Sequence, residues 1–132
     1  MKIHHVGYLV KNIEKSINSF EMLGFSIIRE PQYDEYRDID ICFMKNGEYV
    51  IELVSPKTKN SVVAELKKKL GNSPYHFCYE VDDIEEAINK LREQKFVVWQ
   101  EPHEAIAIGG RKVVFLINSQ IGIVELVEST RS

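Results

Sequence analysis

Residues 5–31 read HVGYLVKNIEKSINSFEMLGFSIIREP, and residues 76–102 read HFCYEVDDIEEAINKLREQKFVVWQEP. Aligned at an offset of 71, the two stretches share 10 identities in 27 positions, where ordinary composition gives roughly one in sixteen by chance. Further identities follow at slightly larger offsets, namely Phe43 with Phe115, and 52–54 with 125–127. We therefore expect a duplicated module whose loops differ in length between the copies.

Each copy has the pattern of a strand, a helix and three further strands. In the first copy, apolar residues recur at helical spacing between Asn12 and Gly24, and in the second Asp83 and Glu86 have the spacing of a capping box. Stretches that suit strands follow each helix, at 25–29, 39–44 and 48–54 and at 96–100, 112–117 and 122–127. The pattern predicts an α+β fold of two βαβββ modules.

The 132 residues favour one domain, with module 1 at about 1–56 and module 2 at about 73–128. Between them, the segment Ser61–Leu70 predicts a connecting helix (about 60–71), with Val62, Leu66 and Leu70 on its apolar face. A module of roughly 55 residues buries little core alone, so we expect the two modules to pack as a single domain over 1–132.

Composition excludes several classes of protein. The net charge of −3 provides no broad basic face for nucleic acid. The longest apolar run, Val113–Ile117, is far shorter than the about 20 residues that span a bilayer, and Met1–His5 lacks the apolar stretch of a signal peptide, so we expect a soluble, cytoplasmic protein. Two cysteines, Cys42 and Cys78, form no disulfide framework and are expected to be small buried residues. The chain contains no GxGxxG, GxxxxGK[ST] or GxSxG motif.

The repeat places one histidine and one glutamate in an apolar strand of each module. Glu52 lies 47 residues after His5, and Glu125 lies 49 residues after His76. A carboxylate among Ile, Val and Leu is costly to desolvate unless a positive group faces it. Two modules related by a pseudo-twofold axis would bring all four side chains together, and we expect them to face a common site.

Two imidazoles and two carboxylates suit a first-row divalent cation, with water or substrate completing an octahedron. Nickel, cobalt, zinc, manganese and iron(II) all accept such ligands. Taken singly, a strand histidine is more often structural, and an inward glutamate often pairs with a lysine; the repetition of the pair favours the metal. His4 should point to the opposite face from its neighbour, and His103 follows a proline in a loop, so neither is assigned a ligand role.

The chain resembles the vicinal oxygen chelate superfamily, in particular short bacterial glyoxalase I proteins and methylmalonyl-CoA epimerases. The segments that carry the resemblance are HVG (5–7), ELVSP (52–56), PYHFCYEVDDI (74–84), RKVVFL (111–116) and GIVEL (122–126). The resemblance implies the glyoxalase/bleomycin resistance/dioxygenase fold, with paired modules around a U-shaped metal-binding cleft, often in a homodimer. It also makes His5, Glu52, His76 and Glu125 the ligands of one divalent ion.

For the reaction, the resemblance implies a glyoxalase I, or lactoylglutathione lyase, which isomerises the hemithioacetal of methylglyoxal and a thiol through an enediolate. The ion acts there as a Lewis acid, and a carboxylate moves the proton. Glu125 is then the catalytic base, with Glu52 as its partner or alternate. Nickel, cobalt or zinc is the expected metal, and a small molecule the expected partner.

The chain departs from the sequence patterns of both families at positions that bear on the choice of reaction. Methylmalonyl-CoA epimerases typically carry a glutamate before a Gln-Gly where this chain has Tyr36, Arg37 and Asp38, which places an epimerase second. The residues that hold glutathione in larger glyoxalases are also replaced, so the thiol is left open. Arg37, Arg111 and Lys112 are the basic residues expected near an anionic substrate, and the loop from His103 to Gly110 is either a lid or a plain hairpin connection.

Two further alternatives remain. Non-catalytic members of the same fold sequester small drugs and usually lack the full ligand set. Extradiol dioxygenases generally use two histidines and one carboxylate around iron, so the additional Glu52 counts against them.

Overall fold

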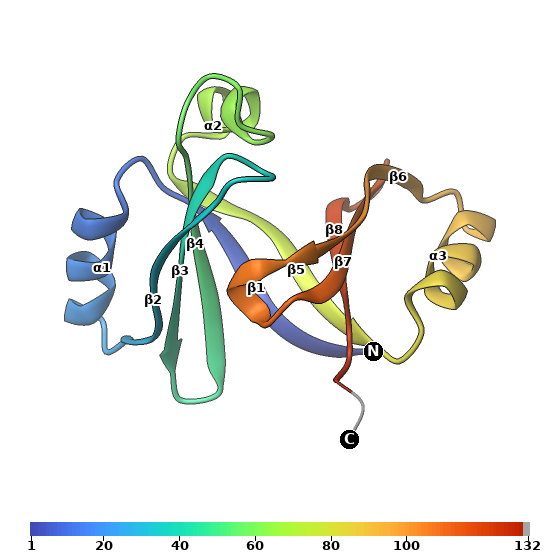
Figure 1. Cartoon of the computed structure of the whole chain (residues 1–132), viewed down its shortest axis with the longest axis horizontal. Helices are drawn as coiled ribbons and strands as arrows, with labels where there is room; N and C mark the ends of the chain where they lie inside the picture. Colours follow the sequence, from blue (N-terminus) through green and yellow to red (C-terminus); the bar gives the residue numbers. More distant parts are fainter. Residues whose placement is uncertain (131–132) are drawn as a thin grey trace. The chain divides into compact units, whose positions relative to one another are not determined.

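The computed structural model describes residues 1–130, and Figure 1 shows its elements. In chain order these are β1 (Lys2–Leu9), α1 (Ile13–Met22), β2 (Ser26–Asp34), β3 (Ile39–Asn46), β4 (Tyr49–Pro56), α2 (Ala64–Leu70), β5 (Ser73–Val81), α3 (Ile84–Glu93), β6 (Val97–Ala105), a 3-10 turn (Ile106–Ile108), β7 (Arg111–Asn118) and β8 (Gly122–Glu128). The order βαβββ occurs twice, with α2 between the copies. This confirms the predicted α+β class and its two modules.

The chain forms two compact units, which we call the first unit (His5–Tyr75) and the second unit (Met1–His4 with the residues from His76 onward). The strand order is β2-β3-β4-β1 in the first and β6-β7-β8-β5 in the second. In each, the first strand of the module pairs in parallel with the last, and the other strands pair antiparallel. The two units therefore share one topology.

In the first unit, α1 packs its apolar side onto the sheet. Asn12 caps the helix, because its side chain accepts a hydrogen bond of 2.8 Å from the Lys15 backbone N–H. Ile13 and Ile17 are buried against β3 and β4 residues that include Leu53. Each such aliphatic side chain contributes about 1.5–3 kcal/mol when fully buried, so the helix is held to the sheet mainly by this cluster.

In the second unit, α3 packs in the same way. The Asp83 side chain accepts a hydrogen bond of 3.1 Å from the Glu86 backbone N–H, which confirms the predicted cap. Ile84 and Ile88 are buried against β7 and β8. Figure 1 shows α1 and α3, each following the first strand of its own module.

The two helices end alike, although their sequences differ there. α1 is followed by Gly24 at φ 98°, and the equivalent residue after α3 is Lys95 at φ 67°. A left-handed residue commonly closes a helix, and glycine adopts it without steric cost. The second copy keeps the same backbone turn with a lysine, at a cost in local strain.

Two predicted segments differ in detail. α2 begins at Ala64 rather than Ser61, because the preceding residues form turns in which the Val62 N–H bonds to the Arg37 carbonyl. Of the three residues on its predicted apolar face, Leu66 is half-buried, whereas Val62 and Leu70 are 40% and 46% exposed. β6 extends through Ala105, so residues 103–105 are paired strand and only 106–110 connect it to β7; this favours the plain hairpin connection over a lid.

Both cysteines, Cys42 and Cys78, are buried, as predicted. None of the helices in residues 1–130 combines the length and apolar character needed to cross a bilayer.

Candidate metal centre

In the first unit, adjacent strands bring His5 and Glu52 together. β1 and β4 are parallel, with Gly7 opposite Glu52. Because side chains two residues apart share a face of a strand, His5 lies on the same face as Glu52. The distance from His5 Nε2 to Glu52 Oε1 is 3.4 Å, and the two residues are 1% and 9% exposed. The first unit therefore holds a buried histidine–glutamate pair.

The second unit repeats this arrangement with His76 and Glu125. β5 and β8 are parallel, with Cys78 opposite Glu125, so His76 again lies two residues before the register partner of the glutamate. The distance from His76 Nε2 to Glu125 Oε1 is 2.8 Å, and these residues are 3% and 4% exposed. The two pairs therefore agree in strand positions, in register and in burial.

Each histidine also packs against a phenylalanine that sequence reasoning did not assign to the site. Phe43 lies opposite Glu52 in the β3–β4 ladder, and Phe115 lies opposite Glu125 in the β7–β8 ladder. The ring centroids of His5 and Phe43 are 5.2 Å apart at 86°, and those of His76 and Phe115 are 5.1 Å apart at 89°. Such edge-to-face contacts restrict the orientation of the imidazole. The identity of the two phenylalanines in the repeat was the signal that could have revealed this role.

The donor atoms of each pair have the spacing of neighbouring ligands on one ion. Metal bonds of about 2.0–2.2 Å at roughly tetrahedral or octahedral angles place two ligand atoms about 3–3.5 Å apart. The observed distances of 3.4 Å and 2.8 Å are close to this range. A single pair provides only two ligands, however, fewer than the about four to six that a divalent cation takes.

The basic residues predicted near the substrate have carboxylate partners of their own. Arg37 is buried, and its Nη1 lies 2.9 Å from Asp34 Oδ2. Arg111 pairs through Nη2 with Glu80 Oε2 at 2.5 Å and donates from Nε to the Glu128 carbonyl. These ion pairs neutralise much of the positive charge of both arginines and fix their side chains.

The third basic residue, Lys112, is exposed on β7, where its register partner across the ladder is Glu104. A contact between any of the three basic residues and substrate therefore stays a prediction.

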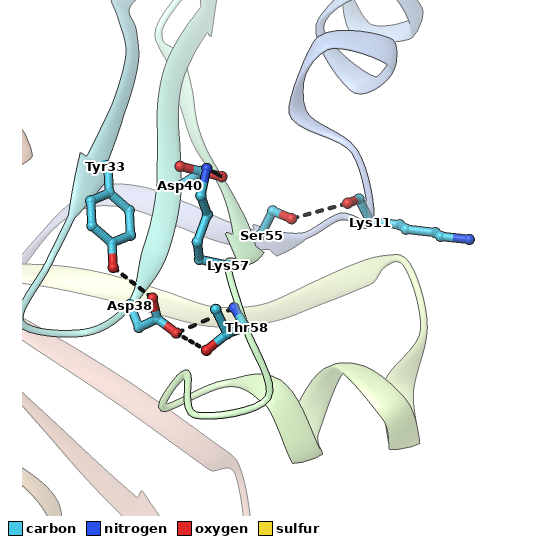
Figure 2. Close-up of polar contacts among 7 residues, drawn as sticks. All are labelled: Lys11, Tyr33, Asp38, Asp40, Ser55, Lys57 and Thr58. Atoms are coloured by element: carbon cyan, nitrogen blue, oxygen red, sulfur yellow. Dashed lines mark hydrogen bonds and ion pairs between the residues drawn. The ribbon is translucent and has the colours of Figure 1, made fainter.

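The turn between β2 and β3, which carries Arg37, is held by hydrogen bonds to the Asp38 side chain (Figure 2). The Tyr33 hydroxyl donates to Asp38 Oδ1 at 2.6 Å, and the Thr58 hydroxyl and backbone N–H donate to Oδ2 at 2.5 and 3.2 Å. These bonds hold Asp38 at a left-handed φ of 54°. The hydrogen bonds from Thr58 and Tyr33 lower the pKa of Asp38, and the same contact raises the pKa of Tyr33 to about 12.

We expect Asp38→Asn to lower the melting temperature at pH 7. Asparagine tolerates the left-handed backbone, so the change mainly removes the charge that accepts these bonds. Because the pKa of Asp38 is lowered in the folded state, its contribution is present above the unfolded value and is lost as pH falls through the folded value. Melting curves from pH 7 to pH 2 should show the difference from wild type shrinking in acid.

Asp40→Asn is the matched control, because Asp40 makes an exposed ion pair with Lys57 at 3.4 Å (Figure 2). Exposed ion pairs contribute little. If Asp38→Asn lowers the melting temperature at pH 7 no more than Asp40→Asn does, the hydrogen bonds to Asp38 do not stabilise this turn as proposed.

Comparison with known proteins places this geometry in a family. The family model that matches residues 4–115 is described as the glyoxalase/bleomycin resistance protein/dioxygenase superfamily. Mitochondrial methylmalonyl-CoA epimerase of Bos taurus is 29% identical over 131 residues, covering 97% of this chain and 74% of that protein. Lactoylglutathione lyase of Neisseria meningitidis serogroup A is 30% identical over 95 residues, covering 71% of this chain and 67% of that protein.

Among solved structures, methylmalonyl-CoA epimerase from Mycobacterium tuberculosis has a TM-score of 0.84 at 20% identity, with 98% of this chain and 89% of that chain covered. This likeness concerns the fold, which agrees with the two βαβββ modules. Both curated relatives are named as enzymes acting on small molecules. The chain belongs to the glyoxalase/bleomycin resistance protein/dioxygenase superfamily.

Proposed function

We propose that this protein is a metal-dependent isomerase of the methylmalonyl-CoA epimerase type, which moves a proton at the carbon beside a thioester carbonyl. Its ligands for one divalent ion are His5, Glu52, His76 and Glu125. The observation that carries the proposal is the duplicated, buried histidine–glutamate pair, found at the same strand positions in both units. Sharing one ion would give it four protein ligands where each pair alone offers two.

The donor set defines what the site can do. A bound divalent cation would supply Lewis acidity toward a carbonyl oxygen, which favours removal of a proton from the adjacent carbon. Glu125 is proposed as the group that takes up this proton on a carboxylate oxygen. Its burial beside Val124 and Leu126 keeps water away and strengthens electrostatic interactions.

Epimerisation also needs a group that returns a proton to the opposite face of the carbon. At the position of the epimerase glutamate this chain has Tyr36, which is 62% exposed. The Arg37 guanidinium lies over its ring, with Cζ 5.4 Å from the ring centroid. Glu52 is the remaining carboxylate of the two pairs, and we assign the return of the proton to it. Glu52 would then replace the glutamate that epimerases typically carry where this chain has Tyr36.

The comparisons reverse the order of the two reactions expected from sequence. The bovine epimerase aligns with 97% of the chain, whereas the lactoylglutathione lyase aligns with 71%. By their names, both relatives act on thioesters or thiol adducts. Because the lactoylglutathione lyase covers less of the chain, the glyoxalase reaction becomes the second candidate. The nature of the metal belongs to the same proposal, with nickel, cobalt and zinc as the first ions to test.

We expect chelator-treated protein to be inactive and to regain activity with one of these ions. Methylmalonyl-CoA of one configuration at C2, placed in deuterated water, should then exchange its C2 hydrogen, as followed by NMR, and convert to a mixture of both configurations, whereas methylglyoxal with glutathione should give no thioester. Thioester formation without epimerisation would replace the proposal by the glyoxalase reaction. A protein that binds no metal would overturn both and favour the non-catalytic binder.

A further inference from the structure

A pocket lies along α1 in the first unit. Its volume is about 600 Å³, within the range of about 300–1,000 Å³ typical of small-molecule sites. The lining residues come from the end of β1, from α1 and from the turn before β5. Among them are Tyr8, Lys11, Lys15, Ser19, Phe20 and Asn72.

This pocket is on the other face of the sheet from the histidine–glutamate pair. Side chains alternate along β1, so Tyr8 and Val10 point away from the face that carries His5. Tyr8 and Val10 belong to the core cluster beneath α1, whereas His5 packs on Phe43. The pocket is therefore distinct from the proposed catalytic site.

One wall of the pocket is formed by aromatic and aliphatic side chains. Tyr8 and Phe20 make an edge-to-face contact with centroids 5.1 Å apart, and Phe20 makes another with Phe25 at 5.3 Å. Val10 and Leu23 extend this wall. An aliphatic group placed here would lose its contact with water against preformed aromatic faces.

The outer rim carries two lysines whose charges are not neutralised. Within residues 1–130, neither the Lys11 nor the Lys15 ammonium group pairs with a carboxylate. The backbone of Lys11 is fixed on both sides, because its N–H donates to Asn72 Oδ1 at 2.9 Å and its carbonyl accepts from the Ser55 hydroxyl at 3.0 Å. Figure 2 shows its side chain extending away from this anchored backbone. The rim is thus positioned for an anionic group.

The second unit provides an internal comparison. Its equivalent pocket, of about 330 Å³, lies along α3, where Asp82 and Glu86 occupy the repeat positions of Lys11 and Lys15. There Glu86 Oε1 pairs with Lys90 Nζ at 3.8 Å, and Asp82 Oδ1 accepts a hydrogen bond from the Ser129 hydroxyl. The same module therefore folds with either sign of charge at this rim, and the lysines are not required by the fold.

We propose that the pocket along α1 binds a small amphipathic anion, with an aliphatic chain against Tyr8 and Phe20 and a carboxylate or phosphate monoester between Lys11 and Lys15. The two lysines favour a negative headgroup, and the apolar wall adds affinity for an aliphatic chain, which inorganic phosphate lacks. The site goes beyond the proposed isomerase activity and does not depend on it.

Decanoate, decyl phosphate and uncharged decanol serve as probes for the full chain after metal removal. Isothermal titration gives the dissociation constants, and ¹⁵N amide shifts give the location. We expect one of the two anions to bind with shifts centred on α1, and Lys11→Gln/Lys15→Gln to weaken that binding at least tenfold while leaving decanol unaffected. The tighter of the two anions identifies the headgroup.

Lys45→Gln/Lys59→Gln is the matched control, since it removes the same charge from exposed positions outside the pocket, and it should bind as wild type does. Ser19→Trp keeps both lysines and fills the pocket, so it should also abolish binding. Equal affinity in the Lys11→Gln/Lys15→Gln variant, shifts centred elsewhere, or no binding at millimolar anion would overturn the proposal. Melting curves of each variant establish that it is folded.

Discussion

Replacing Glu125 by glutamine should lower kcat by about 10²–10⁴-fold, the usual contribution of a positioned acid–base group. Glutamine has nearly the same shape and still fits beside His76, but its amide takes up no proton at neutral pH. The measurement is the rate of C2 hydrogen exchange in deuterated water for the configuration of methylmalonyl-CoA whose proton Glu125 removes, at metal concentrations that saturate each protein.

Two controls distinguish loss of proton transfer from loss of the bound metal. Glu48→Gln makes the same change at an exposed residue between β3 and β4, and it should leave the rate unchanged. The metal content of Glu125→Gln, measured after dialysis, shows whether the loss follows from an absent ion. A variant with full metal content and full exchange rate would remove Glu125 from the mechanism.

Glu52→Gln gives the complementary result if Glu52 returns the proton to the opposite face. Exchange of the C2 hydrogen from one enantiomer should continue, because Glu125 still removes and returns that proton on its own face. Inversion should slow by a comparable factor, about 10²–10⁴. Equal loss of exchange and inversion would instead indicate that Glu52 acts only as a ligand.

Much of the fold could be predicted because the βαβββ module occurs twice in the sequence. The repeat identified both helices, and the cap on α3 followed from Asp83 and Glu86 alone. A repeated histidine and glutamate in apolar strands also singled out these four residues, and the structure places the two members of each pair on adjacent parallel strands. That all four face one common site stays a prediction.

The parts that escaped prediction lie outside the repeat or depend on tertiary contacts. The segment before α2 has no counterpart in the second module, and its start depends on a bond from Val62 to the distant Arg37 carbonyl. The ion pair of Arg111 with Glu80 joins residues 31 positions apart, whose proximity no local pattern reveals. The pocket along α1 likewise arises from the docking of a helix on a sheet, and sequence periodicity describes the buried face of a helix but not the space beside it.

Addition of the correct metal should raise the melting temperature of chelator-treated wild-type protein by roughly 10 °C at a hundredfold excess over the dissociation constant. His5→Ala and His76→Ala should each lose most of this rise, because each removes one of the four proposed ligands. His103→Ala is the matched control, since His103 lies in β6 and its Nδ1 contacts the neighbouring Glu104 carbonyl; it should retain the full rise.

Stoichiometry then decides between one shared ion and two separate ones. If both pairs hold a single ion, wild type binds one equivalent, and either histidine variant loses affinity for that same ion. If each pair bound its own ion, wild type would bind two equivalents and His76→Ala would keep one with undiminished affinity at His5 and Glu52. The first outcome is expected, because two protein ligands hold a divalent cation weakly whereas four satisfy its usual coordination. Under this interpretation the duplication has a functional reason, since neither module alone provides a competent site.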